Sequence, residues 1–97
     1  MPTWSQSDRF RKDLEGLSKE ERKQFQEAVK KFVEDLRSGK FRRGLRIRGI
    51  QGAPGVFELT WEGSDGRATF QFGPPIHPNE PHVIWRRVGG HSIFDQP

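Results

Sequence analysis

The 97-residue chain is basic and contains no cysteine. Its 17 lysine and arginine residues exceed 13 acidic residues, which gives a formal net charge of +4 and a pI near 10.0. This length supports one hydrophobic core, so we expect a single domain over residues 1–97. Disulfide frameworks, thiolate nucleophiles and thiolate metal sites are excluded. No apolar run approaches the ~20 residues of a membrane span, and the first residues lack a signal-peptide pattern. We therefore expect a cytoplasmic protein with no membrane partner.

The first expected element is a short helix. Ser7 or Asp8 can cap it, Phe10 and Leu14 give it an apolar side, and Gly16 interrupts it.

A longer helix follows. Ser18 and Glu21 form a capping box at its start, and Ser38-Gly39 supplies the stop. Between them an apolar stripe has the spacing of a helix face: Phe25, Ala28, Val29, Phe32, Val33 and Leu36. We expect the two helices to form an antiparallel hairpin whose aromatic stripe belongs to the core.

The basic residues are concentrated after the second helix. No acidic residue lies between Asp35 and Glu58, and this segment carries Arg37, Lys40, Arg42, Arg43, Arg46 and Arg48. Arginine makes bidentate contacts with phosphate and carboxylate groups, so the segment is predicted to attract a polyanion or an acidic protein. A solvated strand and loop is the alternative interpretation.

From Leu45 onward the apolar period changes to that of strands. Alternation predicts half-buried strands around residues 45–48, 57–62, 67–72 and 82–88, with turns at 52–55 and 62–66. The predicted fold class is α+β, with the helical hairpin packed on one face of a twisted antiparallel sheet of about four strands. The opposite face would be an open polar floor made of Arg46, Arg48, Glu58, Thr60, Glu62, Arg67, Thr69 and Gln71.

The chemistry that this floor offers is acid, base and cation together. Cleavage of RNA without a metal needs a base, an acid and cations for the phosphorane, and histidine, with an unperturbed pKa of about 6.5, suits the proton transfers. Glu58, Arg67 and His91 are candidates, although Glu58 could simply pair with an arginine and His91 could be an ordinary tail residue. Arg86 and Arg87 cannot both face the floor unless a β-bulge intervenes.

The three histidines are not spaced as metal ligands. His77, His82 and His91 lack the spacing of a metal site, so we expect no metal and no cofactor.

Several segments in succession resemble the RelE/ParE superfamily of toxins, in its RelE/HigB/YoeB-like branch. These are residues 10–14 with Leu17, the helix end at 35–39, the Gly-x-x-Gly-x-Phe-Glu-Leu stretch at 52–59, and the C-terminal stretch at 85–94. The resemblance implies a bacterial toxin of a type II toxin–antitoxin pair, inhibited by a cognate antitoxin. RelE-like members cut mRNA on the ribosome without a metal, whereas ParE-like members poison DNA gyrase.

The resemblance also implies roles for particular residues. Arg67 and Arg87 correspond to arginines that stabilise the scissile phosphate, His91 to a histidine used for proton transfer, and Glu58 loosely to a catalytic acid. The predicted RNA-binding residues are Lys40, Arg42, Arg43, Arg46, Arg48 and Phe94.

Two departures from the family keep other functions open. The chain has no tyrosine, and Phe94 stands where many ribonuclease members have one. Pro2-Thr3-Trp4 leaves at most a stub of the family's first strand. A catalytically inactive toxin-fold binding or regulatory protein, or a gyrase-directed toxin, are the alternatives to an mRNA endoribonuclease.

Overall fold

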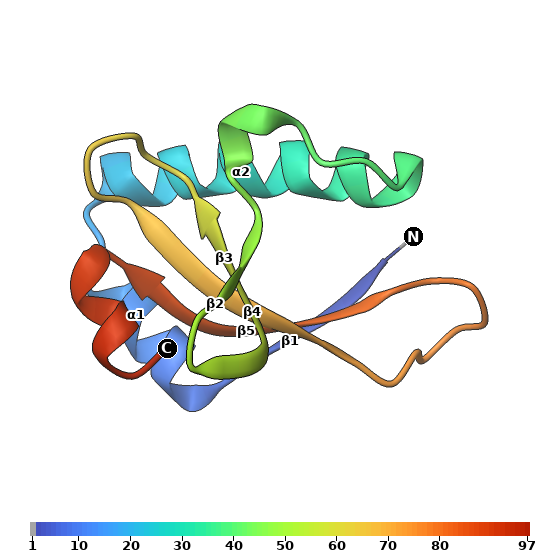
Figure 1. Cartoon of the computed structure of the whole chain (residues 1–97). Coiled ribbons are helices and arrows are strands. Elements are labelled where there is room, and N and C mark those ends of the chain that lie inside the picture. The colour runs from blue at the N-terminus through green and yellow to red at the C-terminus, as the bar shows by residue number, and fades with distance from the viewer. Residues whose placement is uncertain (1) are drawn as a thin grey trace.

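A computed structural model describes residues 2–97 as an α+β fold in which α2 lies across one face of a twisted sheet (Figure 1). The sheet has five strands in the order β1-β5-β4-β3-β2. The elements are β1 (Thr3–Gln6), α1 (Asp8–Glu15), α2 (Lys19–Ser38), β2 (Arg48–Ile50), β3 (Ala53–Thr60), β4 (Arg67–Gly73), β5 (His82–Gly89) and short 3₁₀ turns at Arg43–Leu45 and His91–Asp95. The predicted fold class is confirmed. Within residues 2–97, neither helix has the length and apolar character to cross a bilayer.

The expectation of an antiparallel sheet of about four strands is wrong, because β1 adds a fifth strand in parallel with β5. Thr3 lies opposite His82 in this pairing, and its hydroxyl lies 2.7 Å from Nδ1 of that histidine. Trp4 stays 64% exposed, so this edge strand lacks a clear apolar alternation. The stub expected at residues 2–4 is therefore a complete edge strand.

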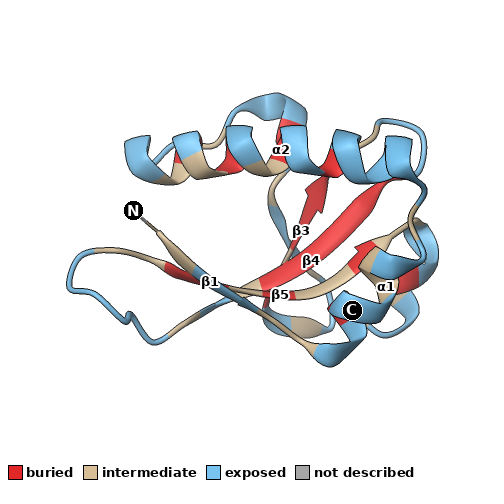
Figure 2. Cartoon of the chain, turned by 180° about the vertical axis from the view of Figure 1, so that it is seen from behind, coloured by how far each residue is buried: buried red, intermediate tan, exposed pale blue. Residues whose placement is uncertain are grey.

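Both helices begin and end where their capping residues predict. The Ser7 hydroxyl accepts a hydrogen bond from the Phe10 amide at the start of α1. The Ser18 and Glu21 side chains form both bonds of the capping box of α2, which ends at Gly39 with φ of 76°. The expected hairpin is not observed, because α2 crosses the sheet while α1 lies at one end of it against β5 (Figures 1 and 2).

The core lies between α2 and the sheet, where Figure 2 shows the buried residues. Phe32 of α2 is 1% exposed and packs against Phe70 and Trp85, with ring centroids 4.9 and 5.5 Å away. Phe10 of α1 joins this cluster by stacking on Trp85 at 5.8 Å. Burial of one such ring stabilises the fold by about 1.5–3 kcal/mol, so the aromatic stripe is core, as predicted.

The basic segment is less extended than its alternation predicts. Leu45 is buried at the end of a 3₁₀ turn, and Arg46 adopts a left-handed conformation with φ of 48°. A residue in this conformation cannot continue a strand, so β2 begins only at Arg48. The expected strand over residues 45–48 is therefore wrong. The predicted turn at 52–55 is displaced toward Gly52 (φ 85°), and β3 already begins at Ala53.

A β-bulge in β5 decides where its two arginines point. Thr69 lies opposite Arg87 and Phe70 lies opposite Trp85, which leaves Arg86 as the extra residue. The Ser7 hydroxyl donates a hydrogen bond to the Arg86 carbonyl at 2.8 Å. The bulge allows both Arg86 and Arg87 to project from the outer face of the sheet, the face turned away from α2.

Candidate active site

The outer face of the sheet is covered, in contrast to the predicted open floor. Glu58 and Arg67 are each 8% exposed, and Thr69 is fully buried. The C-terminal turn His91–Asp95 packs against β4 and β5, with Ile93 buried beneath it. An open floor is therefore wrong, because the last residues of the described chain fold back over the polar strands.

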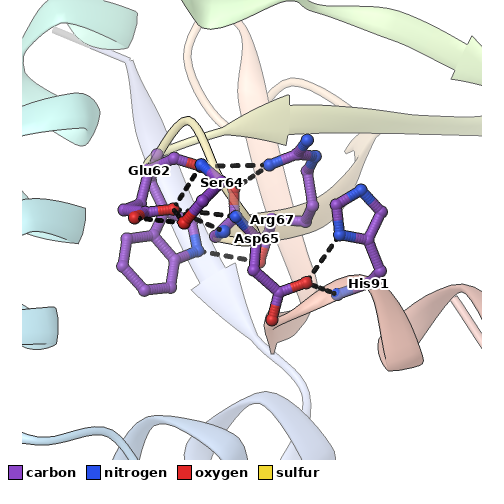
Figure 3. Close-up of polar contacts among 7 residues, drawn as sticks. Glu62, Ser64, Asp65, Arg67 and His91 are labelled. Atoms are coloured by element: carbon purple, nitrogen blue, oxygen red, sulfur yellow. Dashed lines mark hydrogen bonds and ion pairs between the residues drawn. The ribbon is translucent and has the colours of Figure 1, made fainter.

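The turn between β3 and β4 is built around the Glu62 carboxylate (Figure 3). Its Oε1 accepts hydrogen bonds from the backbone amides of Ser64, at 2.7 Å, and Asp65, at 2.8 Å. The Ser64 hydroxyl donates to the same carboxylate, and these bonds lower the pKa of Glu62 to about 2. The ionised carboxylate thereby fixes the conformation of the turn that carries Asp65.

Asp65 and His91 form a hydrogen-bonded pair (Figure 3). One carboxylate oxygen, Oδ1, accepts from the His91 backbone amide at 3.0 Å and lies 2.6 Å from Nδ1 of the ring. The backbone and side-chain bonds from His91 lower the pKa of Asp65. Because the Asp65 carboxylate accepts a hydrogen bond from Nδ1–H, the neutral ring presents its lone pair at Nε2. This side chain is 53% exposed, so Nε2 is accessible.

The close approach of this pair depends on a glycine. A Cβ at Gly90 would lie 2.1 Å from Oδ2 of Asp65, which is far inside van der Waals contact. A hollow of 330 Å³ lies beside the pair, lined in part by Trp61, Asp65 and Gly90. The glycine therefore lets the carboxylate reach the His91 backbone while one side stays open.

Arg67 stabilises the turn between β3 and β4 through hydrogen bonds to two of its carbonyls. Its Nη1 donates to the Gly66 carbonyl at 2.9 Å and to the Glu62 carbonyl at 3.0 Å. Its own carbonyl accepts from Nε1 of Trp61 at 2.8 Å. The predicted phosphate arginine thus lies close to Asp65, whose pKa its charge helps to lower, but it is buried in the turn.

Glu58 and Arg87 lie in one row across the sheet. The register places Arg48, Glu58, Thr69 and Arg87 opposite one another on four successive strands. Glu58 forms an ion pair with Arg48, which is the alternative that the sequence left open. Arg87 donates from Nε to Oδ2 of Asp13 at 2.6 Å, an ion pair that joins β5 to α1. The row separates Glu58 from Arg87 by the buried Thr69.

The predicted RNA-binding residues divide into two groups. Arg42 is engaged in ion pairs with Glu34 and Asp35, which raise its pKa and lower that of Asp35, so it connects the loop to the end of α2. Lys40, Arg43, Arg46 and Arg48 are exposed as Arg42 is, and Arg48 is itself paired with Glu58. Three of these arginines line a shallow hollow of 390 Å³. Phe94 lies edge-on to the His91 ring, with centroids 5.9 Å apart.

His82 has a structural contact with β1 and takes no part in the Asp65–His91 pair. His82 is buried and lies within hydrogen-bond distance of the Thr3 and Ser5 hydroxyls of β1. Within the described range 2–97, no group of three or more histidine, aspartate or glutamate side chains is arranged to hold a metal ion.

Sequence reasoning missed Asp65. The stretch from Glu62 to Gly66 indicates a tight turn, and an aspartate before a glycine is an ordinary turn residue. Only the spatial approach of residues 65 and 91 reveals its second function. Sequence reasoning also left Arg86 without a role, although it named the bulge that brings this residue to the outer face.

The architecture is that of RelE-like toxins. The toxin YafQ in the Escherichia coli DinJ–YafQ complex matches with a TM-score of 0.69 at 13% identity, over 94% of this chain and 93% of that chain. The RelB–RelE complex of Methanococcus jannaschii matches at 0.59 and 21% identity, over 95% of this chain and 98% of that chain. A mutant of E. coli RelE in the free state matches at 0.62 and 19% identity, over 98% and 92%. The fold expected from the resemblance is confirmed.

No protein-family model matches the sequence, and no curated protein is significantly similar to it.

Proposed function

We propose that the chain is the toxin of a toxin–antitoxin pair and acts as an endoribonuclease on mRNA at the ribosome. The pairing of Asp65 with His91, on a RelE-like fold, carries this proposal. An aspartate that holds Nδ1 of a histidine leaves Nε2 to exchange protons, and positioned acid–base groups accelerate reactions by about 10²–10⁴-fold.

The proposed reaction uses the 2′-hydroxyl of the RNA as nucleophile. Nε2 of His91 takes its proton, the 2′-oxygen attacks the adjacent phosphorus, and the bond to the 5′-oxygen breaks. The products are a 2′,3′-cyclic phosphate and a 5′-hydroxyl, which forms when the leaving oxygen takes up a proton. Arg87 supplies positive charge for the phosphorane.

Two residues of the predicted site, Arg67 and Glu58, do not contact the RNA phosphate directly in this proposal. Arg67 acts through the turn that positions Asp65, since its guanidinium bonds to the Glu62 and Gly66 carbonyls. Glu58 as the acid for the leaving oxygen stays a prediction, and its carboxylate is held by Arg48.

The proposed partner is an antitoxin protein. The DinJ–YafQ and RelB–RelE structures contain toxins bound to their antitoxins. The exposed cations Lys40, Arg43, Arg46 and Arg48 would attract an acidic segment that folds on binding. We expect the chain to be produced well only when the gene of its partner is expressed with it.

Expression of the chain from a tightly controlled promoter tests this function. Mapping of the 5′ ends of cellular mRNA minutes after induction is expected to reveal cuts within coding regions. His91→Ala should abolish them, whereas His77→Ala, a matched change in an exposed loop, should leave them intact.

The same cultures separate the alternative functions. A change in plasmid topology without mRNA cleavage would replace the ribonuclease with a gyrase-directed toxin. Healthy cells with intact mRNA would favour the third function, a catalytically inactive binding or regulatory protein with the toxin fold.

A further inference from the structure

A histidine at the start of β5 lies between two hydroxyl groups of β1. Nδ1 of His82 is 2.7 Å from the Thr3 hydroxyl, and Nε2 of the same ring is 3.2 Å from the Ser5 hydroxyl. His91 follows the other end of β5. This cluster of Thr3, Ser5 and His82 is therefore separate from the Asp65–His91 pair.

The backbone brings these three side chains to one side of the sheet. The parallel register places Thr3 opposite His82, and Ser5 faces the same side as Thr3 because residues two apart in a strand share a face. Gly73 lies opposite His82 on β4, and a Cβ there would lie 3.1 Å from Cδ2 of the ring. The glycine thus leaves room for the imidazole to lie against the neighbouring strand.

The cluster has the arrangement of a nucleophile, a base and a group that orients the base. In the tautomer with its proton on Nδ1, the ring donates to the Thr3 hydroxyl, and Nε2 accepts a hydrogen bond from the Ser5 hydroxyl. His82 is 8% exposed, whereas Ser5 is exposed. Reagents in solution therefore reach the hydroxyl, and the base behind it is held in place.

The backbone next to Ser5 offers a donor for negative charge. The Thr3 amide donates toward β5, to the Pro81 carbonyl at 3.1 Å. Amides alternate in direction along a strand, so the Gln6 amide is directed toward the open edge of the sheet, where β1 is the last strand. An amide in this position can stabilise the oxyanion that forms when Ser5 attacks a carbonyl group.

We propose that Ser5 is a nucleophile that accepts acyl groups from activated carboxylic esters, with His82 as its general base and Thr3 as a positioning residue. Oγ of Ser5 attacks the carbonyl carbon while Nε2 of His82 takes the hydroxyl proton. The bond to the leaving oxygen breaks, that oxygen receives the proton, and the products are acyl-Ser5 and an alcohol. Water then attacks the acyl group with the same base, which releases the carboxylic acid and restores Ser5.

Diisopropyl fluorophosphate detects such a nucleophile, because Oγ attacks phosphorus, fluoride leaves and the serine stays phosphorylated. Ser38 is the internal control, since it is also exposed and its hydroxyl bonds to backbone groups. Mass spectrometry of peptides measures both residues in one sample. Ser5 should be labelled about 100-fold faster than Ser38, which is the lower end of what a positioned base contributes.

Unfolding the chain in urea removes the contact between Ser5 and His82 without changing the sequence. Under these conditions Ser5 and Ser38 should be labelled at equal rates. A preference for Ser5 that persists in urea would come from local sequence and would contradict the proposed role of His82.

Substitutions assign the three roles. His82→Gln should lower the labelling of Ser5 to the rate of Ser38, in a chain that circular dichroism shows to be folded. Thr3→Val keeps the shape of the side chain without its hydroxyl and should slow the labelling of Ser5 by about 10- to 100-fold. Thr3→Ser keeps a hydroxyl and should retain the rate.

The ester reaction is followed as the release of p-nitrophenolate from p-nitrophenyl acetate. Ser5→Ala should lower this release, whereas Ser38→Ala should leave it unchanged.

Equal labelling of Ser5 and Ser38 in the folded native chain would overturn the proposed nucleophile, whether or not the His82 variant folds. An unchanged rate in Thr3→Val would remove Thr3 from the site. None of these measurements involves RNA, so the proposed ester chemistry and the proposed cleavage of mRNA succeed or fail independently.

Discussion

The two faces of the sheet are stabilised in different ways. On the face under α2, side chains such as Phe32 and Phe70 are almost completely buried and touch other rings. On the outer face, Arg87 and Asp13 keep 17% and 19% of their side chains exposed and are held by hydrogen bonds. Burial of apolar side chains stabilises the face under α2, and pairing of charged side chains stabilises the outer face.

This difference suits the role proposed for Arg87, which lies on the outer face. A close-packed apolar layer has one stable arrangement, since any change in volume opens a cavity or causes strain. Paired polar groups can exchange one partner for another of the same chemistry. A surface that binds and releases a charged ligand therefore needs the second kind of stabilisation.

The largest expected effect comes from a cavity on the face under α2. Phe32→Ala should lower the free energy of unfolding by about 3–5 kcal/mol, because it removes a buried ring. Ile76→Ala changes a side chain that is 61% exposed and should alter stability by about 0.5 kcal/mol or less. Denaturant unfolding measures both, and equal effects would mean that burial does not stabilise the face under α2.

The next prediction breaks the Asp65–His91 pair without changing either residue. Gly90→Ala places a methyl group where the Asp65 carboxylate lies, and the carboxylate must move away. Cleavage of mRNA should fall by about 100-fold while the chain stays folded. The control is Gly63→Ala, because nothing lies within 4 Å of a Cβ at that position. Full cleavage by Gly90→Ala would remove the pair from the mechanism.

A smaller effect is expected at the ion pair between α1 and β5. Asp13→Asn removes the charge that accepts from Arg87 and should cost about 1–3 kcal/mol of unfolding free energy. Glu27→Gln removes the partner of Lys30 in an exposed pair on α2 and should cost about 0.5 kcal/mol or less. Denaturant midpoints compare the two, and a cost at Asp13 no larger than at Glu27 would mean that the outer face does not depend on its pairing.

The smallest expected effect is on the loss of stability at acidic pH. Folding lowers the pKa of Glu62 from 4.5 to about 2, so the unfolded chain binds more protons at this site between these values. Its contribution to stability is complete above the unfolded pKa and is lost as the pH falls toward the folded one. Glu62→Gln should therefore flatten the decline of melting temperature in this range.

Melting curves of Glu27→Gln provide the reference for that experiment. An equally steep decline in Glu62→Gln and the reference would show that the turn carboxylate has no part in acid sensitivity.

The sequence predicted the elements that carry local signals. Ser18, Glu21 and Gly39 define α2 because capping chemistry acts over a few residues. Strand alternation alone would place Arg86 and Arg87 on opposite faces, and the sequence named a bulge as the exception without predicting that β5 has one.

Features that depend on distant partners were not predictable. β1 pairs with residues almost eighty positions away, and nothing in its own four residues indicates a strand. The role of Asp65 depends in the same way on His91. The burial of Arg67 follows from the shape of one turn, whose carbonyls happen to meet its guanidinium.

The pairing of the first strand with the last one also sets an order of folding. Proteins are synthesised from the N-terminus, so β1 and α1 leave the ribosome long before β5 exists. The acceptor for Ser7 and the partner of Asp13 both lie on β5. The N-terminal elements must therefore wait for the final part of the described chain. A nascent copy cannot assemble this framework until β5 has been made, and β5 is also the strand that leads into His91.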